Sequence, residues 1–261
     1  MDLRVQDKRY LIVGGTAGMG YAAAEVLAAD GARLVLSGRT PERAERAMAA
    51  LGSNVSTVLG DATEVDTADR LVGEAVEQMG GLDGILITTG LLGHTTFEAT
   101  SDADWDAAYQ DVLMATVRSV RAAMPHLVAN GGGTVVTTSA YSISAYKPAR
   151  MPYVMMKTAV ASFTKIIARE YGDRGIRANV VCPGAIETES LQTVRKMLAE
   201  ATGEPPEGLL ERYMVDEWHL DVALKRPGQP EEVGDLMAFL LSPRAGYLTG
   251  AVINIDGGTE F

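Results

Sequence analysis

The sequence predicts a doubly wound α/β fold, in which a parallel β-sheet carries helices on both faces. Apolar runs of strand length alternate with longer helical patterns along the 261 residues. The runs are continuously apolar, which is typical of parallel strands that are buried on both faces. A hydrophobic content of 47% is enough for a large core. Strands that alternate with helices through right-handed crossovers then give a doubly wound sheet.

Seven strands are expected, and most of them end in glycine or a small polar residue. Parallel strands place such residues together at one edge of the sheet, where open α/β sheets bind ligands. The expected strands span residues 9–15, 33–38, 54–61, 83–90, 132–140, 175–184 and 251–258.

The helices between these strands follow from their composition and from their starting and stopping residues. The first is rich in alanine and closes at Gly31, and others begin after Pro41, Pro152 and Pro230, since proline suits the first helical turn. They are expected at 18–31, 41–50, 63–81, 102–130, 153–171 and 230–241. No repeat or linker divides the chain, so residues 1–261 are interpreted as one domain with a long insertion at about 185–226.

Composition argues against several classes of protein. A net charge of −11 disfavours a groove that follows nucleic-acid phosphates. The single cysteine, Cys182, suits a reducing compartment. We see neither an apolar run of the ~20 residues that span a bilayer nor a secretory signal, so no membrane association and a cytoplasmic location are expected. No metal site is expected, because His94, His126 and His219 are scattered.

Tyr153 and Lys157 are four residues apart in a predicted helix, so their side chains share one face. Tyr153 falls in the first turn, where the helix dipole is positive. A nearby cation and this dipole lower a phenol pKa, which makes a proton donor usable near neutral pH. The alternative is an aromatic packing residue followed by a surface lysine.

The turn after the first strand has the spacing Gly14-x-x-x-Gly18-x-Gly20 and opens a helix. Glycines at such a turn let the backbone approach a diphosphate that rests on the helix N-terminus. A purely structural turn is the alternative.

Taken together, these motifs resemble the short-chain dehydrogenase/reductase family over nearly the whole chain, in particular its NADP-dependent carbonyl reductases and 3-oxoacyl reductases. The supporting residues follow successive strands: the glycine turn, Asp61, Gly90, Ser139, Tyr153 with Lys157, and 183–188, which read PGAIET. The resemblance implies a Rossmann-type three-layer sandwich with a seven-stranded parallel sheet. It also implies a dimer or tetramer, with a homotetramer as the expectation, formed through the helices around 109–127 and 153–171.

The resemblance also assigns roles to residues. Tyr153 is the general acid/base, Lys157 lowers its pKa and bonds the nicotinamide ribose, and Ser139 bonds the substrate oxygen. Ser142 competes for that last role, and Ser139 is preferred because it ends the strand. The expected cofactor-binding residues are Gly14, Thr16, Ala17, Gly18, Met19, Gly20, Ser37, Arg39, Thr40, Asp61, Ala62, Gly90, Tyr153, Lys157, Pro183, Gly184, Ile186 and Thr188.

Two of these assignments have simpler alternatives. Asp61 is expected to hold the adenine amino group, but an aspartate here also suits a helix cap or turn. Pro183 and Gly184 are expected to shape a turn below the nicotinamide, whose carboxamide Ile186 and Thr188 contact, but an ordinary Pro-Gly turn has the same sequence.

The end of the second strand predicts NADP(H) in preference to NAD(H). An acid usually grips the ribose hydroxyls of NAD at this position, whereas Gly38 stands here and Arg39 follows. A guanidinium can pair with a 2′-phosphate through two hydrogen bonds. A solvated arginine is the alternative.

Three positions depart from the family pattern. Val13 replaces a threonine, Ile87-Thr88-Thr89 replaces Asn-Asn-Ala before Gly90, and Val112 replaces an asparagine at a helix irregularity. A backbone carbonyl at this helix irregularity can hold a water that leads to the lysine and relays protons, whatever the side chain. An active enzyme is therefore expected if the irregularity persists.

The chain is therefore predicted to move hydride between NADP(H) and a ketone or secondary alcohol, with the 185–226 segment covering the substrate. One alternative is a non-catalytic NADP-binding sensor on the same fold. Another is a nucleotide-sugar epimerase or dehydratase, which generally carries an additional C-terminal domain.

Overall fold

A seven-stranded sheet forms the centre of the computed structural model, which describes residues 2–90, 96–146, 150–217 and 220–259. Its strand order is β3-β2-β1-β4-β5-β6-β7, and every neighbouring pair is parallel. The chain thus winds outward in two directions from the boundary between β1 and β4, which confirms the predicted doubly wound sheet. The strands are β1 Arg9–Val13, β2 Arg33–Gly38, β3 Val55–Leu59, β4 Gly84–Ile87, β5 Gly133–Thr138, β6 Ile176–Pro183 and β7 Val252–Ile255.

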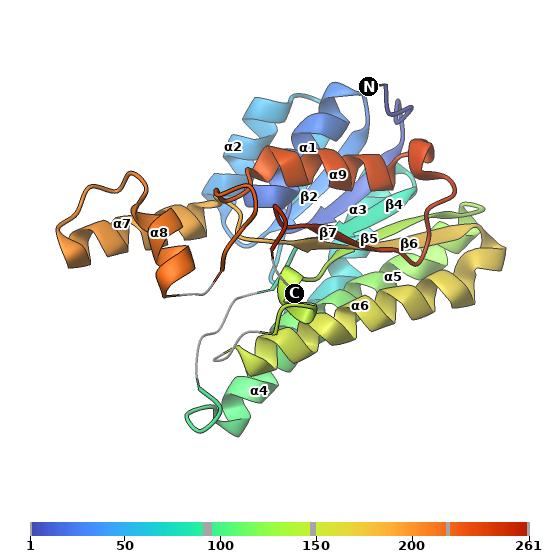
Figure 1. Ribbon diagram of the computed structural model, residues 1–261. Helices are drawn as coiled ribbons and strands as arrows, with labels where there is room; N and C mark the ends of the chain where they lie inside the picture. The colour runs from blue at the N-terminus through green and yellow to red at the C-terminus, as the bar shows by residue number, and fades with distance from the viewer. Residues whose placement is uncertain (1, 91–95, 147–149, 218–219, 260–261) are drawn as a thin grey trace.

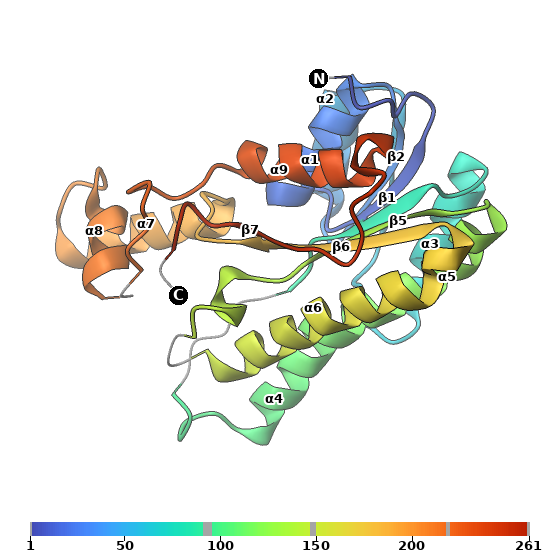
Figure 2. The ribbon, with the colours of Figure 1, turned by 45° about the vertical axis from the view of Figure 1, so that its right-hand side comes forward.

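Helices cover both faces of this sheet (Figure 1), as three-layer packing requires. One face carries α1 Gly18–Ala29, α2 Pro41–Leu51 and α9 Pro230–Leu241. The other carries α3 Thr67–Met79, α5 Ala115–Ala129 and α6 Met151–Tyr171, with α4 Asp102–Ala108 before α5. Two further helices, α7 Glu189–Thr202 and α8 Leu209–Asp216, form a lobe beside the sheet (Figures 1 and 2).

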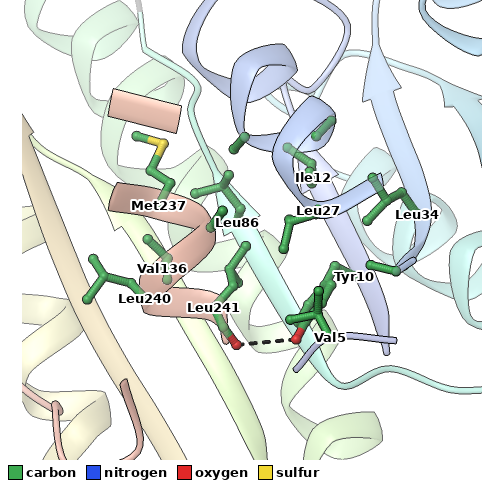
Figure 3. Close-up of a cluster of buried hydrophobic side chains, with 14 of the residues drawn as sticks. Val5, Tyr10, Ile12, Leu27, Leu34, Leu86, Val136, Met237, Leu240 and Leu241 are labelled. Atoms are coloured by element: carbon green, nitrogen blue, oxygen red, sulfur yellow. Dashed lines mark hydrogen bonds between the residues drawn. The ribbon is translucent and has the colours of Figure 1, made fainter. Parts of the chain in front are cut away.

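Strands β1 to β6 divide their buried side chains between two separate cores. On β1, Ile12 joins the cluster under α1 and α9, whereas Leu11 and Val13 join the cluster under α3 and α5. Figure 3 shows the first cluster, in which Leu27, Leu86 and Met237 meet. At its edge the buried Tyr10 hydroxyl donates to the carbonyl oxygen of Leu241 at 3.3 Å, so the polar group is not left unpaired.

The long helix expected at 102–130 differs from the prediction, because a π-helical segment at Tyr109–Met114 interrupts it. Periodicity cannot show a π segment, which adds one residue to a turn without breaking the run of helical residues. The family resemblance marks Val112 as the position of a helix irregularity, and the π segment shows that the irregularity persists with valine. The helix with Tyr153 begins at Met151, so Tyr153 does lie in its first turn.

Candidate active site

The expected site residues gather where the parallel strands end, on both sides of the β1–β4 boundary. The ends of β1 and β2 lie side by side, with Val13 paired to Ser37, and β4 continues the row through Ile87. A crevice outside the strand ends at such a switch point is where open α/β sheets bind ligands.

The glycine-rich turn packs too closely for side chains at two of its positions. A Cβ at Gly20 would lie 2.5 Å from the carbonyl oxygen of Gly14, and Gly14 itself has a φ of +83°. Both glycines also face the Thr88 hydroxyl, which donates to the carbonyl oxygens of Val13 at 3.1 Å and of Gly14 at 3.2 Å. Thr88 thus ties β4 to the turn, at one of the positions where the family has asparagine.

The N-terminus of α1 presents backbone N–H groups that no capping side chain uses. Ala17 is the N-cap residue and makes no side-chain hydrogen bond, and no acidic residue lies in the first turn. Gly18 and Met19 follow it, and Thr16 packs against Gly38 at the end of β2. Free N–H groups at the positive end of a helix dipole form a site for an anion such as a diphosphate.

The end of β2 and the loop after β3 bring Arg39 and Asp61 together. Their closest nitrogen and oxygen atoms are 3.6 Å apart. The other Asp61 oxygen accepts from the backbone N–H of Thr63 at 3.0 Å and from its hydroxyl at 2.8 Å. Burial raises the pKa of the Asp61 carboxyl, but the bonds from Thr63 and the charge of Arg39 outweigh it, so this pKa lies below its ordinary value. Ser37 and Ala62 are buried near this pair, and Thr40 is the N-cap residue of α2, without a side-chain capping hydrogen bond.

Lys157 is a buried cation held by two strand ends. Its Nζ donates to the carbonyl oxygen of Thr138 at 2.9 Å and to that of Thr89 at 3.2 Å. Gly90, at a φ of +132°, leaves room for it, since a Cβ there would lie 2.9 Å from Nζ. The Nζ lies 5.6 Å from the ring centre of Tyr153. The predicted pairing of these two side chains on one helix face is therefore present.

Burial moves the pKa values of these two groups apart. It raises the pKa of Tyr153 to about 12, against the lowering expected from Lys157 and the helix dipole, because burial outweighs the opposing positive charge of Arg150. It lowers the pKa of Lys157 to about 8. At neutral pH the phenol is thus protonated and able to donate, and the ammonium is charged. The sequence did not indicate Arg150, which precedes Tyr153 by three residues and also bonds the Tyr141 hydroxyl.

The two candidate serines differ in what their hydroxyls do. Ser139 follows β5 as expected, but its Oγ donates to the carbonyl oxygen of Lys157 at 2.8 Å. Ser142 lies in the short turn after it, which packs against α6, and is 1% exposed. Among the described residues, its Oγ is one of three buried side-chain atoms without a hydrogen-bond partner, together with atoms of Thr89 and Asp256. The structure therefore favours Ser142 more than the strand-end argument did.

The π segment places Val112 near the Tyr153–Lys157 pair. Gly90 lies between Lys157 and the Val112 side chain. The carbonyl oxygen of Val112 accepts from the Thr116 hydroxyl at 3.0 Å, so a neighbouring side chain supports the irregular turn that an asparagine supports in the family.

The loop after β6 forms the other wall of the site. Gly184 fits tightly over Asp256, and its N–H donates to the carbonyl oxygen of Ile255 at 3.0 Å. Ile186 pairs with Gly228 as an isolated bridge, and Thr188 is the N-cap residue of α7, without a side-chain capping hydrogen bond. The Thr188 methyl lies 3.4 Å from the Cβ position of Gly18, so this loop approaches the glycine-rich turn.

The structure adds two plain findings on metals and membranes. Within residues 2–90, 96–146, 150–217 and 220–259, no three His, Cys, Asp or Glu side chains cluster as metal ligands. His94 and His219 lie outside these ranges. In the same ranges, no helix has the length and apolar character to cross a membrane.

Comparison with known proteins identifies the family. A family model described as enoyl-(acyl carrier protein) reductase matches residues 14–260. The chain belongs to the short-chain dehydrogenase/reductase family. It is 33% identical over 263 residues to dehydrogenase/reductase SDR family member 4 of Sus scrofa, covering 98% of this chain and 88% of the relative.

Solved structures of this family share the fold described above. L-sorbose reductase from Gluconobacter frateurii, complexed with NADPH and L-sorbose, superposes with a TM-score of 0.93 at 30% identity, over 99% of this chain and 98% of the other. Levodione reductase superposes with a TM-score of 0.87 at 29% identity, over 97% and 98%. The protein is thus an oxidoreductase of the short-chain dehydrogenase/reductase family with a Rossmann-type fold.

Proposed function

We propose that this short-chain dehydrogenase/reductase transfers hydride between NADP(H) and a ketone or secondary alcohol, with Tyr153 as general acid/base. The observation that carries the proposal is the Tyr153–Lys157 pair at the strand ends, with Lys157 held by the carbonyl oxygens of Thr89 and Thr138. A non-catalytic sensor could use Lys157 to bind the nicotinamide ribose but would have no need for a phenol beside it.

The residues at the strand ends suit a dinucleotide. Gly14 and Gly20 leave a surface on which a Cβ would collide with the backbone or with Thr88, and the first turn of α1 offers uncapped N–H groups for the diphosphate. Asp61 and Ala62 would lie at the adenine, Lys157 and Gly90 at the nicotinamide ribose, and Ile186 and Thr188 at the nicotinamide.

The protein's own groups account for the proton. When bound, the reduced nicotinamide supplies a hydride to the carbonyl carbon. Tyr153 donates its hydroxyl proton to the carbonyl oxygen, and the buried Lys157 ammonium stabilises the phenolate that remains. In the reverse direction the tyrosinate accepts the alcohol proton. A second hydrogen bond to the substrate oxygen comes from Ser142, or from Ser139 if it releases the carbonyl of Lys157.

Three features support NADP(H) over NAD(H). Gly38 puts no carboxylate at the end of β2, and Arg39 is exposed enough to turn from Asp61 to a 2′-phosphate. The similar L-sorbose reductase is described in complex with NADPH. A polyol-like ketone is accordingly one substrate class worth testing.

We also propose that two or four copies assemble through α5 and α6, in the cytoplasm. An open apolar groove of about 500 Å³ runs between these helices, lined by Val117, Val120, Met124, Phe163, Ile167 and Tyr171 among others. Ile166 of α6 is 60% exposed. A second copy would cover this surface.

The deciding experiment is an assay of NADPH consumption with a panel of ketoses, cyclic diketones, 3-oxoacyl thioesters and enoyl thioesters. We expect turnover with at least one carbonyl substrate and less with NADH. Reduction of enoyl thioesters alone would replace carbonyl reduction with the activity that the family description names. NADPH binding without turnover of any substrate would favour the sensor.

A further inference from the structure

The lobe of α7 and α8 buries few side chains. None of the residues of α7, Glu189–Thr202, is fully buried. The lobe stands beside the sheet rather than on either face (Figures 1 and 2). Its apolar contacts form one small cluster, in which Leu210 and Met214 of α8 meet Tyr141 and Ala145. A segment with so little burial depends more than the core does on specific polar contacts.

Arg195, in the middle of α7, supplies such contacts to three segments at once. Its Nε and Nη2 donate to the two carboxylate oxygens of Glu187 at 3.1 and 2.9 Å. Its Nη1 and Nη2 donate to the two oxygens of Glu211 at 3.1 and 2.9 Å. Nη1 also donates to the carbonyl oxygen of Pro206 at 3.3 Å. One guanidinium thus joins α7 to the loop after β6, to α8 and to the turn between the two helices.

This network is less exposed than the other ion pair within the lobe. The side chains of Arg195, Glu187 and Glu211 are 21%, 14% and 30% exposed, whereas those of Arg212 and Glu204 are 55% and 46% exposed. Two-pronged pairs that are partly shielded from water are stronger and more precise in geometry than exposed pairs. Without Arg195, two carboxylates would be left close together without the cation that they share.

Glu187 connects the Arg195 network to the loop that is expected to contact the nicotinamide. It lies between Ile186 and Thr188, and its N–H donates to the carbonyl oxygen of Gly228 at 2.9 Å. The Thr188 N–H donates to the carbonyl oxygen of Ile186 at 2.7 Å. The Glu187 side chain thus ties Arg195 to the loop that holds the two residues proposed to face the nicotinamide.

We infer that Arg195 is a positioning residue. It fastens the lobe of α7 and α8 to the loop at residues 186–188, and so sets the position of the nicotinamide for hydride transfer. The inference rests on the proposed function, because it assumes that Ile186 and Thr188 contact that ring. Under this inference two arginines act at opposite ends of the cofactor, Arg39 at the 2′-phosphate and Arg195 at the nicotinamide.

The test compares Arg195→Met with Arg212→Met, which breaks the exposed pair in the same lobe. For Arg195→Met we expect the Kd of NADPH to rise, and kcat to fall, by about tenfold each, since small misplacements of reacting groups cost 10- to 100-fold in rate. The Kd of adenosine 2′,5′-bisphosphate, which has no nicotinamide, should stay within about twofold. Arg212→Met should leave all three quantities within about twofold, as expected for an exposed pair.

A folded Arg195→Met variant with unchanged NADPH affinity and kcat would overturn the inference. Equal weakening of NADPH and the bisphosphate would also overturn it, because that pattern indicates general damage to the cleft. If Arg195→Met fails to fold, the double variant Arg195→Met/Glu211→Met removes one of the two repelling carboxylates and is judged by the same criteria. A wild-type protein that binds no NADPH would instead count against the proposed function.

Discussion

Lys157 and Arg195 both hold a part of the candidate site, but they do so in different surroundings. Lys157 is buried and donates to backbone carbonyl oxygens at the ends of β4 and β5. Arg195 lies in a partly exposed lobe and donates mainly to side-chain carboxylates. The first cation is placed by the register of the sheet and the second by pairs of long side chains. We therefore expect the chemical step to depend on the core and cofactor placement to depend on the rim, formed by Arg39 and Arg195.

The largest effect should come from the buried centre. Tyr153→Phe removes the proton donor but little packing, so we expect kcat to fall by at least about a hundredfold, in line with the 10²- to 10⁴-fold value of general acid catalysis. NADPH affinity, followed by nicotinamide fluorescence, should hardly change. Wild-type turnover in this variant would show that the phenol does not carry the reaction, and the contrast between centre and rim would fail with it.

The next effect belongs to the rim. Arg39→Ala should weaken NADPH binding by roughly 1.5–3 kcal/mol, the range for charge-assisted hydrogen bonds. NADH affinity should barely change, because NADH lacks the 2′-phosphate, and kcat at saturating NADPH should be retained. Titration of both cofactors measures this. Equal losses for NADPH and NADH would contradict the proposed phosphate contact.

A smaller effect distinguishes the two serines. Ser142→Ala removes a buried hydroxyl that has no partner within the described residues, so we expect kcat to fall by about tenfold if it bonds the substrate oxygen. Ser139→Ala removes the bond to the carbonyl oxygen of Lys157 and should lower the free energy of unfolding by about 1–3 kcal/mol, with a smaller change in kcat. Thermal unfolding and kinetics on both variants test this. The opposite pattern would return the role to Ser139.

The same division explains what could be predicted from the sequence. Continuous apolar runs that end in glycine were sufficient to predict seven parallel strands. The i, i+4 spacing was sufficient to predict the Tyr153–Lys157 pair. These features depend on local periodicity, which a single chain displays. The direction of the Ser139 hydroxyl and the approach of Arg150 to Tyr141 depend on how separate segments pack. So does the network of Arg195, whose partners lie 8 and 16 residues away in the chain. No spacing rule covers such contacts.

The smallest predicted effect is the pH dependence that the buried Lys157 gives to stability. Burial lowers its pKa from 10.5 to about 8, so between these values the unfolded chain binds a proton that the folded protein does not. The contribution of Lys157 to stability therefore rises with pH through this window, and below about pH 8 the cost of burying the charge is present in full. From about pH 8 to about pH 9 the rise should be about 1 kcal/mol. Tyr153 and Cys182 also titrate at high pH, so the measured quantity is the difference in unfolding free energy between wild type and Lys157→Met. In denaturant titrations this difference should move in favour of the wild type as pH rises. A difference that stays constant with pH would mean that Lys157 keeps an ordinary pKa, and that the centre of the site is less shielded from water than its burial indicates.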